Sequence, residues 1–463
     1  MVDGMPIRVI SRAVRFATLC VAASAGWASE KVLVLGDSLS EEYYFQLPFS
    51  APSSDPTRAN TRNWIEILAD RRADDLDFGE FKSSPLAYSD LRNGGFAYNW
   101  GVPGAKATDM VDLIHLGSPP SNPSEWPEYY LKQRSLDRIK QHLDSIVDLA
   151  VVFLGGNDVN SRYGEFYQGT IPETFLDSVV DDLREIVRFI RGRNAEAGIV
   201  LVNVPDVGIT PKVAGNHPDP VKRAAATDIL ADLNGRIAAM AAAEGAVIAD
   251  LFGLTRLIGG GADFHLNGRL LVRAPDPENP PDHLFTRDGF HASTSAQALI
   301  ANVIVEAINQ EWSTGVELLA GREILAQVLD LDPDQPWLDW LASHGLEGAG
   351  PGDNPHGDAV PLGIQFAFGL IPGGASVVRQ KAGIESGAEA PGDGRFLRVF
   401  WSDFDDRHGY LEPEIQWSPD LIHWQNMPLG SHVIRHEPTG IETWLPIGAA
   451  DAGWLRLSPK VTP

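Results

Sequence analysis

Short runs of consecutive apolar residues recur along the first two thirds of the chain, separated by longer stretches with helical periodicity. Strands that are buried on both faces carry mostly apolar runs, so these segments predict a mostly parallel sheet. The five segments are 32–35, 97–100, 146–154, 199–204 and 246–250; the first is wholly apolar, and each of the others contains one polar residue. The stretches with apolar residues at helical spacing are 63–68, 175–190, 218–243 and 293–308. Strands that alternate with helices are typical of an α/β fold built from βαβ units.

The last third of the chain has a different pattern. Residues 316–329 predict one more helix, and a segment rich in Pro, Gly and Asp follows it to about residue 361. Short alternating stretches such as 396–401 and 454–457, separated by turn residues, then predict a small antiparallel β-sandwich. We therefore divide the chain into a main domain at 29–312, a helix and linker at 313–360, and a β-rich module at 361–463.

The N-terminal residues, 1–28, predict a secretory signal peptide. Arginines within residues 8–15 form a positive region, and the apolar stretch 16–25 that follows is too short to span a bilayer as a stable helix. Small residues occupy the two positions that a signal peptidase reads, so we expect cleavage after Ala28 and a secreted or periplasmic protein. The alternative is a disordered N-terminal extension. Because the only cysteine, Cys20, lies in this segment, the mature chain would have neither disulfides nor thiol catalysis.

Length and charge narrow the class of protein. The 463 residues suggest two or three domains, and an apolar share of 44% leaves ample material for a core. The formal net charge of −25 argues against a nucleic-acid partner, which needs a basic surface. The acidic balance suits a soluble, secreted protein or a neutral substrate. No stretch after the N-terminal segment is long and apolar enough to be transmembrane, so we expect no stable membrane insertion.

The first apolar run ends in Gly36-Asp37-Ser38-Leu39. A strand that ends in a tight turn presents its next polar side chain at the carboxyl edge of a parallel sheet, where open α/β folds place their ligands. Ser38 is therefore a candidate nucleophile, provided that a base lies close to it. The alternative is a β-turn without chemistry, because glycine, aspartate and serine are ordinary turn residues.

Asp288 and His291 are the candidates for the base and its orienting partner. They lie three residues apart, just before a helix for which Ser293 is the expected N-cap. In a nucleophile–base–orienter triad the imidazole takes the serine proton, while the carboxylate fixes its tautomer and stabilises the imidazolium. The alternative is a helix-capping pair. His265 and His283 lack an acidic residue at the same spacing, and we expect both on the surface.

Two further strand ends carry residues that could stabilise a developing negative charge. The second run leads into the glycine-containing loop 101–105, and a loop of this type can aim a backbone N–H, here that of Gly104, at an oxyanion. The third run ends in Gly155-Gly156-Asn157-Asp158. The Asn157 amide could donate to an oxyanion, and Asp158 is expected to hold the loop by binding backbone N–H groups. The alternative in both cases is a plain turn.

Taken in order, these blocks resemble the SGNH, or GDSL, hydrolase family over roughly residues 30–312. The matching blocks are Gly36-Asp37-Ser38-Leu39, Asn99-x-Gly101-x-x-Gly104, Gly155-x-Asn157-Asp158 and Asp288-x-x-His291. The resemblance implies a flavodoxin-like, three-layer α/β/α fold with five parallel strands, and ester hydrolysis through an acyl-enzyme. It implies Ser38 as nucleophile, His291 as base and Asp288 as its orienter. The implied oxyanion donors are the N–H groups of Ser38 and Gly104 and the side chain of Asn157.

The sequences of residues 99–105 and 202–205 are similar to those found in the longer, secreted lipase-like branch of that family. That branch usually follows its serine with Asp-x-Gly-Asn, whereas this chain has Glu41-Glu42-Tyr43-Tyr44. The acyl or alcohol pocket is therefore expected to differ. The irregular insertions 41–93 and 106–146 follow the first two blocks, and we expect them to wall the site.

Near the C-terminus, residues 416–424 read Gln-Trp-Ser-Pro-Asp-Leu-Ile-His-Trp. With residues 337–369, they resemble a C-terminal module of secreted proteins from Verrucomicrobia-like bacteria. Its tryptophans could form a carbohydrate platform, but we favour core aromatics. The acidic residues between 330 and 358 break the alternation of a calcium loop, so we favour a solvated linker over a calcium site.

These expectations combine into a secreted serine esterase without cofactor or metal. Its substrate would be a carboxylic ester, lipid-like or an acylated carbohydrate, with short acyl esters and O-acetyl groups on carbohydrate as the leading classes. Contact with a polysaccharide or cell surface would run through residues 361–463. Two alternatives stay open: an acyltransferase that uses the same acyl-enzyme, and a carbohydrate- or surface-binding protein whose hydrolase fold is catalytically idle.

Overall fold

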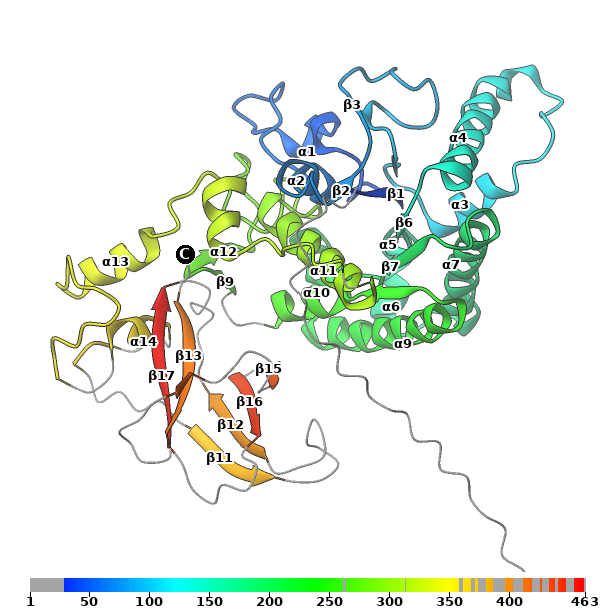
Figure 1. Ribbon diagram of the computed structural model, residues 1–463. Coiled ribbons are helices and arrows are strands. Elements are labelled where there is room, and N and C mark those ends of the chain that lie inside the picture. The colour runs from blue at the N-terminus through cyan, green and yellow to red at the C-terminus, as the bar shows by residue number, and fades with distance from the viewer. Residues whose placement is uncertain are drawn as a thin grey trace, which may run out of the picture.

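The computed structural model describes residues 29–260, 264–312, 314–357, 361–367 and 371–373, together with strands between residues 380 and 461 (Figure 1). The expected signal peptide lies outside the described residues. None of the described helices combines the length and the apolar character that crossing a bilayer requires.

A parallel sheet forms the centre of the main domain. Its strands are β1 (Glu30–Gly36), β2 (Leu76–Asp77), β5 (Asn99–Gly101), β6 (Leu149–Phe153), β7 (Gly198–Val202) and β8 (Val247–Ala249). All pairs are parallel in the order β2-β1-β6-β7-β8, and β5 pairs with the carboxyl end of β1. This is a flavodoxin-like order, so the predicted α/β fold class is confirmed. The expectation of five strands differs only in that the short β2 and β5 share the position beside β1.

Alternate residues of the central strands pack against two different helical layers. Leu33 and Leu35 pack on one side, whereas Val32 and Val34 pack on the other. The first layer contains α3 (Ala107–Ile114), α4 (Trp126–Ser145), α7 (Glu173–Arg193) and α9 (Pro220–Glu244). The second contains α2 (Trp64–Arg71), α11 (Thr294–Trp312) and residues 316–331. The result is the expected three-layer arrangement.

Local sequence explains where these helices form. In α7 the apolar residues Val179, Leu183, Ile186 and Ile190 recur every three or four positions, and all are buried. Burial of each such side chain contributes about 1.5–3 kcal/mol relative to exposure, so the sheet face stabilises the helix that covers it. α2 begins at a capping box between Asn63 and Glu66, whose side chains and backbone N–H groups bind one another at 2.8 and 2.9 Å.

Several elements depart from the sequence predictions. The insertion 106–146 was expected to be irregular, yet it holds α3 and the 20-residue α4. The buried residues of α4 begin only at Ser135, so its first half carries no apolar pattern. The expected helix at 316–329 consists only of α12 (Gly321–Glu323) and the π-helical turn η4 (Ile324–Val328), because residues 314–320 form no regular element and Gly315 has a left-handed φ of +73°.

The predicted linker also contains structure. Helix α13 (Gln335–Ser343) packs Trp337 and Trp340 against Phe366 of α14 (Leu362–Ala367), with ring centroids 5.3 and 5.6 Å apart. These two tryptophans are therefore core aromatics, although they belong to a helix and not to the predicted sandwich. The remaining short elements are η1 (Tyr43–Phe45), α1 (Leu47–Ser50), β3 (Phe81–Lys82), β4 (Gly95–Phe96), η2 (Pro123–Glu125), α5 (Gly156–Ser161), α6 (Tyr163–Gln168), η3 (Val207–Ile209), α8 (Pro211–Asn216), α10 (Leu251–Gly259), β9 (Phe264–Leu266) and β10 (Arg269–Leu271).

The C-terminal strands form two antiparallel sheets, in the orders β11-β12-β16-β15 and β14-β13-β17. Their bounds are β11 (Gln380–Glu385), β12 (Phe396–Ser402), β13 (Leu411–Ser418), β14 (Gln425–Asn426), β15 (Val433–Glu437), β16 (Gly440–Pro446) and β17 (Trp454–Val461). Both stretches singled out by their alternation, 396–401 and 454–457, lie in these strands. The Asp-Leu-Ile-His-Trp turn at 420–424 lies outside the described residues, and the sandwich packing stays a prediction.

Candidate active site

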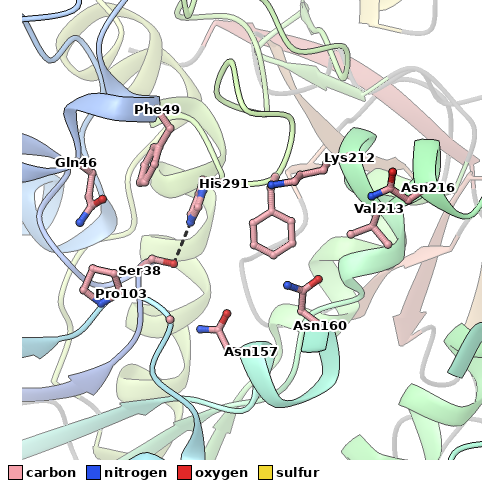
Figure 2. A pocket seen from close by; sticks show the side chains of 12 residues that line it. Ser38, Gln46, Phe49, Pro103, Asn157, Asn160, Lys212, Val213, Asn216 and His291 are labelled. Atoms are coloured by element: carbon pink, nitrogen blue, oxygen red, sulfur yellow. Dashed lines mark hydrogen bonds between the residues drawn. The ribbon is translucent and has the colours of Figure 1, made fainter. Parts of the chain in front are cut away.

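Ser38 lies at the carboxyl end of β1, near the middle of the sheet. A turn follows the strand, in which Ser40 and Glu41 donate their N–H groups to the carbonyl of Asp37 at 3.0 and 2.9 Å. Gly36 is required here because a Cβ atom at this position would lie 2.5 Å from the Ser40 Oγ. The tight turn leaves Ser38 only 8% exposed, with its hydroxyl on the wall of a cavity (Figure 2).

The structure brings Ser38, His291 and Asp288 together. Nε2 of His291 lies 2.9 Å from the Ser38 Oγ, and Nδ1 lies 2.6 Å from Oδ2 of Asp288 (Figure 2 draws the first contact). Both residues come from the loop before α11. Asp288 and His291 thus contact each other within one turn of chain, as the spacing predicts, while Ser38 is supplied from 253 residues earlier.

Asp288 is held as a carboxylate. Its Oδ1 accepts hydrogen bonds from the Thr286 hydroxyl at 2.8 Å and from the N–H groups of Phe290 and His291 at 2.9 and 3.0 Å. Burial by itself would raise the pKa of Asp288, but the hydrogen bond and charge of His291 together with the backbone donors bring it well below the ordinary value. The group can therefore fix the Nδ1–H tautomer of the imidazole and stabilise the imidazolium.

Gly104 and Asn157 lie on the same cavity as Ser38. Gly104 has φ +77°, and no heavy atom lies within 4 Å of the position that a Cβ would take, so the backbone there faces open space. Asn157 lies in the first turn of α5, directly after β6. Its Nδ2 donates to Oδ2 of Asp37 and to the carbonyl of Ala105, both at 3.1 Å.

Two buried aspartates support this arrangement. Burial raises the pKa of Asp37 to about 6, against the opposing effects of the Leu39 N–H and the charge of His291. Asp158 accepts the N–H of Ala107 at 3.0 Å and so ties α5 to the start of α3. Asp158 thus binds a backbone N–H group as predicted, but that group belongs to the start of α3 and not to the loop of Asp158 itself.

The cavity has a volume of about 460 Å³ and a mixed lining. Phe49, Pro103, Val213 and Phe290 are apolar, whereas a second group carries amide or ammonium ends. That group is Gln46, Asn157, Asn160, Lys212 and Asn216 (Figure 2). Sequence reasoning missed most of these residues because they lie in the insertion after Ser38 and in α8, where no motif marks them.

The imidazole of His291 is enclosed by two phenylalanines. The ring of Phe49 is stacked on it, with centroids 4.0 Å apart and planes inclined by 5°. Phe290 contacts it edge-on at 5.2 Å and 86°. Only the position of Phe290 could have been found from the sequence, because it lies inside the Asp288-x-x-His291 block.

Some expectations for this region need correction. Ser293 precedes α11, but its hydroxyl donates to the carbonyl of His283 instead of accepting a helix N–H, so it is not an N-cap of the usual kind. His265 and His283 do not line the cavity, and both are partly buried instead of lying on the surface, because His265 belongs to β9 and His283 pairs with Val272. Within the described part of the chain, no three His, Cys, Asp or Glu side chains gather in a group that could hold a metal ion.

A family model described as GDSL-like lipase/acylhydrolase matches residues 32–304. No curated protein matches the chain. Similar solved structures include the acetyl xylan esterase AlAXEase, with 14% identity, coverage of 60% of this chain and 99% of that one, and a TM-score of 0.32. A variant of the acetyl xylan esterase Axe2 from Geobacillus stearothermophilus has 15% identity, coverage of 63% and 96%, and a TM-score of 0.32. Phospholipase A1 from Streptomyces albidoflavus NA297 has 14% identity, coverage of 60% and 100%, and a TM-score of 0.34.

Proposed function

Since the chain belongs to the GDSL-like lipase/acylhydrolase family of ester-hydrolysing enzymes, we propose that it is a serine esterase whose triad is Ser38, His291 and Asp288. The observation that carries the proposal is the continuous series of contacts from the Ser38 Oγ to His291 at 2.9 Å and on to Asp288 at 2.6 Å. This series ends on the wall of a cavity large enough for a small substrate.

The chemistry follows from these contacts. His291 Nε2 takes the proton of Ser38 as Oγ attacks the ester carbonyl, and the imidazolium is stabilised by Asp288. The tetrahedral intermediate collapses when the carbon–oxygen bond to the alcohol breaks, and His291 gives that alcohol the proton. Water then attacks the acyl-enzyme by the same route, so that carboxylic acid is released and Ser38 is regenerated.

The N–H groups of Ser38 and Gly104 and the amide of Asn157 are the proposed oxyanion donors. The Asn157 amide has two hydrogens, and both already have acceptors, namely Asp37 and the carbonyl of Ala105. We infer that Asn157 turns one of these N–H groups toward the oxyanion as it forms. The remaining bond then keeps the amide in place.

The lining of the cavity favours an ester of a hydroxyl-rich alcohol. Asn160, Lys212 and Asn216 bring donor groups to the side of the cavity opposite Phe49 (Figure 2). Such groups would be left without partners by a long acyl chain, but they fit the hydroxyls of a sugar. We therefore propose short acyl esters, with O-acetyl groups on carbohydrate as the leading class, acted on by a protein secreted after loss of residues 1–28. Residues 361–463 are the proposed contact with the polysaccharide.

The test is hydrolysis of nitrophenyl esters of graded chain length, beside acetylated xylan, by the mature protein and by Ser38→Ala. Turnover that depends on Ser38 and is limited to acetyl groups supports a carbohydrate deacetylase. Turnover that rises with chain length would instead indicate a lipid-like ester. Full activity of Ser38→Ala would overturn the proposed mechanism, and absence of turnover with every ester would favour a binding protein.

A further inference from the structure

The insertion that follows Ser38 packs directly on the loop that carries Asp288 and His291. The Asn279 side chain donates from Nδ2 to the carbonyl of Phe49 at 2.8 Å and to that of Ala51 at 3.1 Å. The guanidinium of Arg287 donates to the carbonyl of Pro48 at 2.9 Å. The segment 47–51 is therefore attached, through its own backbone, to the loop that ends in the proposed base.

These hydrogen bonds hold the side chain of Phe49 in the candidate site. Phe49 is 7% exposed, lines the cavity and lies flat against the His291 ring at 4.0 Å and 5°. The separation is van der Waals contact over the whole ring face, so a tilt of the imidazole loses contact with Phe49 or collides with it. The electron-rich face of Phe49 also attracts the positive imidazolium that forms during the reaction.

We propose that Phe49 is a positioning residue for His291, an inference that rests on the proposed function of the triad. The hydrogen bond to Asp288 fixes one corner of the imidazole, Nδ1, but leaves the ring free to swing about that contact. Phe49 restricts this swing, so Nε2 stays directed at the Ser38 Oγ and afterwards at the leaving alcohol. Phe290 closes the site from another direction, because its edge meets the same ring.

Asn279 acts on His291 indirectly, because it holds the backbone of Phe49 in place. Its φ is +48°, a left-handed conformation that asparagine and aspartate tolerate better than most residues. Its Oδ1 accepts the N–H of Arg287 at 2.6 Å while its amide holds residues 49 and 51. Together with Arg287, the Asn279 side chain thus sets the spacing between the Phe49 backbone and the loop of the base.

The experiment replaces Phe49 by leucine, which keeps an apolar side chain but removes the ring face, and by tyrosine and tryptophan, which keep a ring. With nitrophenyl acetate, Phe49→Leu is expected to lower kcat by about tenfold or more and to leave KM within about threefold, because misplacement of the base affects the chemical step. Either the tyrosine or the tryptophan variant should restore most of kcat. Active protein is counted by stoichiometric labelling of Ser38 with a fluorophosphonate.

Phe78→Leu is the matched control. Phe78 is also a buried phenylalanine, 2% exposed, but it packs edge-on against Trp64 in the core and does not line the cavity. It should lower the unfolding temperature and leave kcat per labelled site unchanged. Asn279→Asp, which keeps the left-handed preference and the acceptor but loses the amide donors, should lower kcat in the same way as Phe49→Leu. The double variant should be little worse than either single variant.

The outcomes separate the two proposals. If Ser38→Ala is inactive while Phe49→Leu keeps kcat within twofold of the wild type, the inference about Phe49 is wrong and the triad stands. It is equally wrong if neither ring-bearing variant exceeds leucine, or if Phe78→Leu loses as much kcat per labelled site. Full activity of Ser38→Ala would overturn the function on which the inference rests.

Discussion

Replacing Asp288 by asparagine should remove nearly all activity while leaving the shape of the site intact. Oδ1 of Asp288 accepts three hydrogen bonds, from Thr286, Phe290 and His291. An amide nitrogen cannot accept them, so the amide oxygen of the variant takes this position. The NH2 group then faces Nδ1 of His291, where the wild type has its 2.6 Å contact.

The expected loss follows from the tautomer that this NH2 group imposes. Because it donates to Nδ1, the ring proton moves to Nε2, which faces the Ser38 Oγ at 2.9 Å. An imidazole that is protonated at Nε2 cannot take the serine proton. A tautomer error of this kind lowers kcat by about 10⁴-fold, which corresponds to about 5 kcal/mol of transition-state stabilisation.

The assay is kcat for nitrophenyl acetate between about pH 6 and 9, with thermal unfolding as the check on folding. Asp288→Ala is the control, because it removes the carboxylate without forcing the proton onto Nε2, and it should keep more activity than the asparagine variant. An Asp288→Asn protein that folds normally and keeps kcat within tenfold of the wild type would refute the role given to Asp288.

Three further predictions concern the oxyanion site, the substrate and stability. Asn157→Ala should lower kcat about 10²-fold with little change in KM, because its amide is needed only as negative charge develops; equal activity would remove it from the oxyanion site. Asn216→Leu should raise KM for acetylated xylan more than for nitrophenyl acetate; the same change for both would argue against a sugar contact. Burial raises the pKa of Glu42 from 4.5 to about 8. The folded state therefore holds the proton more tightly than the unfolded state, and this adds to the free energy of unfolding. The contribution is fully present below about pH 4.5 and is lost as the pH rises through about 8. The unfolding temperature should therefore fall between about pH 5 and 9, and fall less in Glu42→Gln; parallel profiles would show that Glu42 is not the group responsible.

The central fold was readable from the sequence because its strands are buried on both faces. Helices cover both sides of the sheet, so both faces of its central strands are buried and carry apolar residues, as in Val32–Leu35 and Ile199–Val202. Such runs can be recognised in a single sequence. The helix α7 was readable for a similar reason, since its buried face repeats without a break. α4 was not readable, because the half of the helix that extends past the core has no face to bury.

Some residues of the candidate site could likewise be predicted from the sequence, and others could not. Ser38, Gly104, Asn157, Asp288 and His291 follow strand ends or precede a helix, where spacing carries information. The structure places four of them on one cavity, and Asp288 contacts the fourth, His291, through Nδ1. Phe49 and Lys212 could not have been assigned to the cavity from the sequence. Their positions depend on how an irregular insertion and the six-residue helix α8 pack against the rest of the domain. Such positions follow from long-range contacts like those of Asn279, and one sequence does not show them.

The separation of 253 positions between Ser38 and His291 has a consequence for the time at which the proposed triad can form during synthesis. β1 is the first strand of its sheet to leave the ribosome, yet it takes an interior place, and its partner β6 begins only at Leu149. At about 5–20 residues per second, roughly 10–50 seconds separate the emergence of the serine from that of the histidine. A nascent or prematurely terminated chain therefore carries the proposed nucleophile without its proposed base, so the proposed triad is incomplete in it. During the same interval the apolar β1 has to be kept from aggregation until its neighbours arrive.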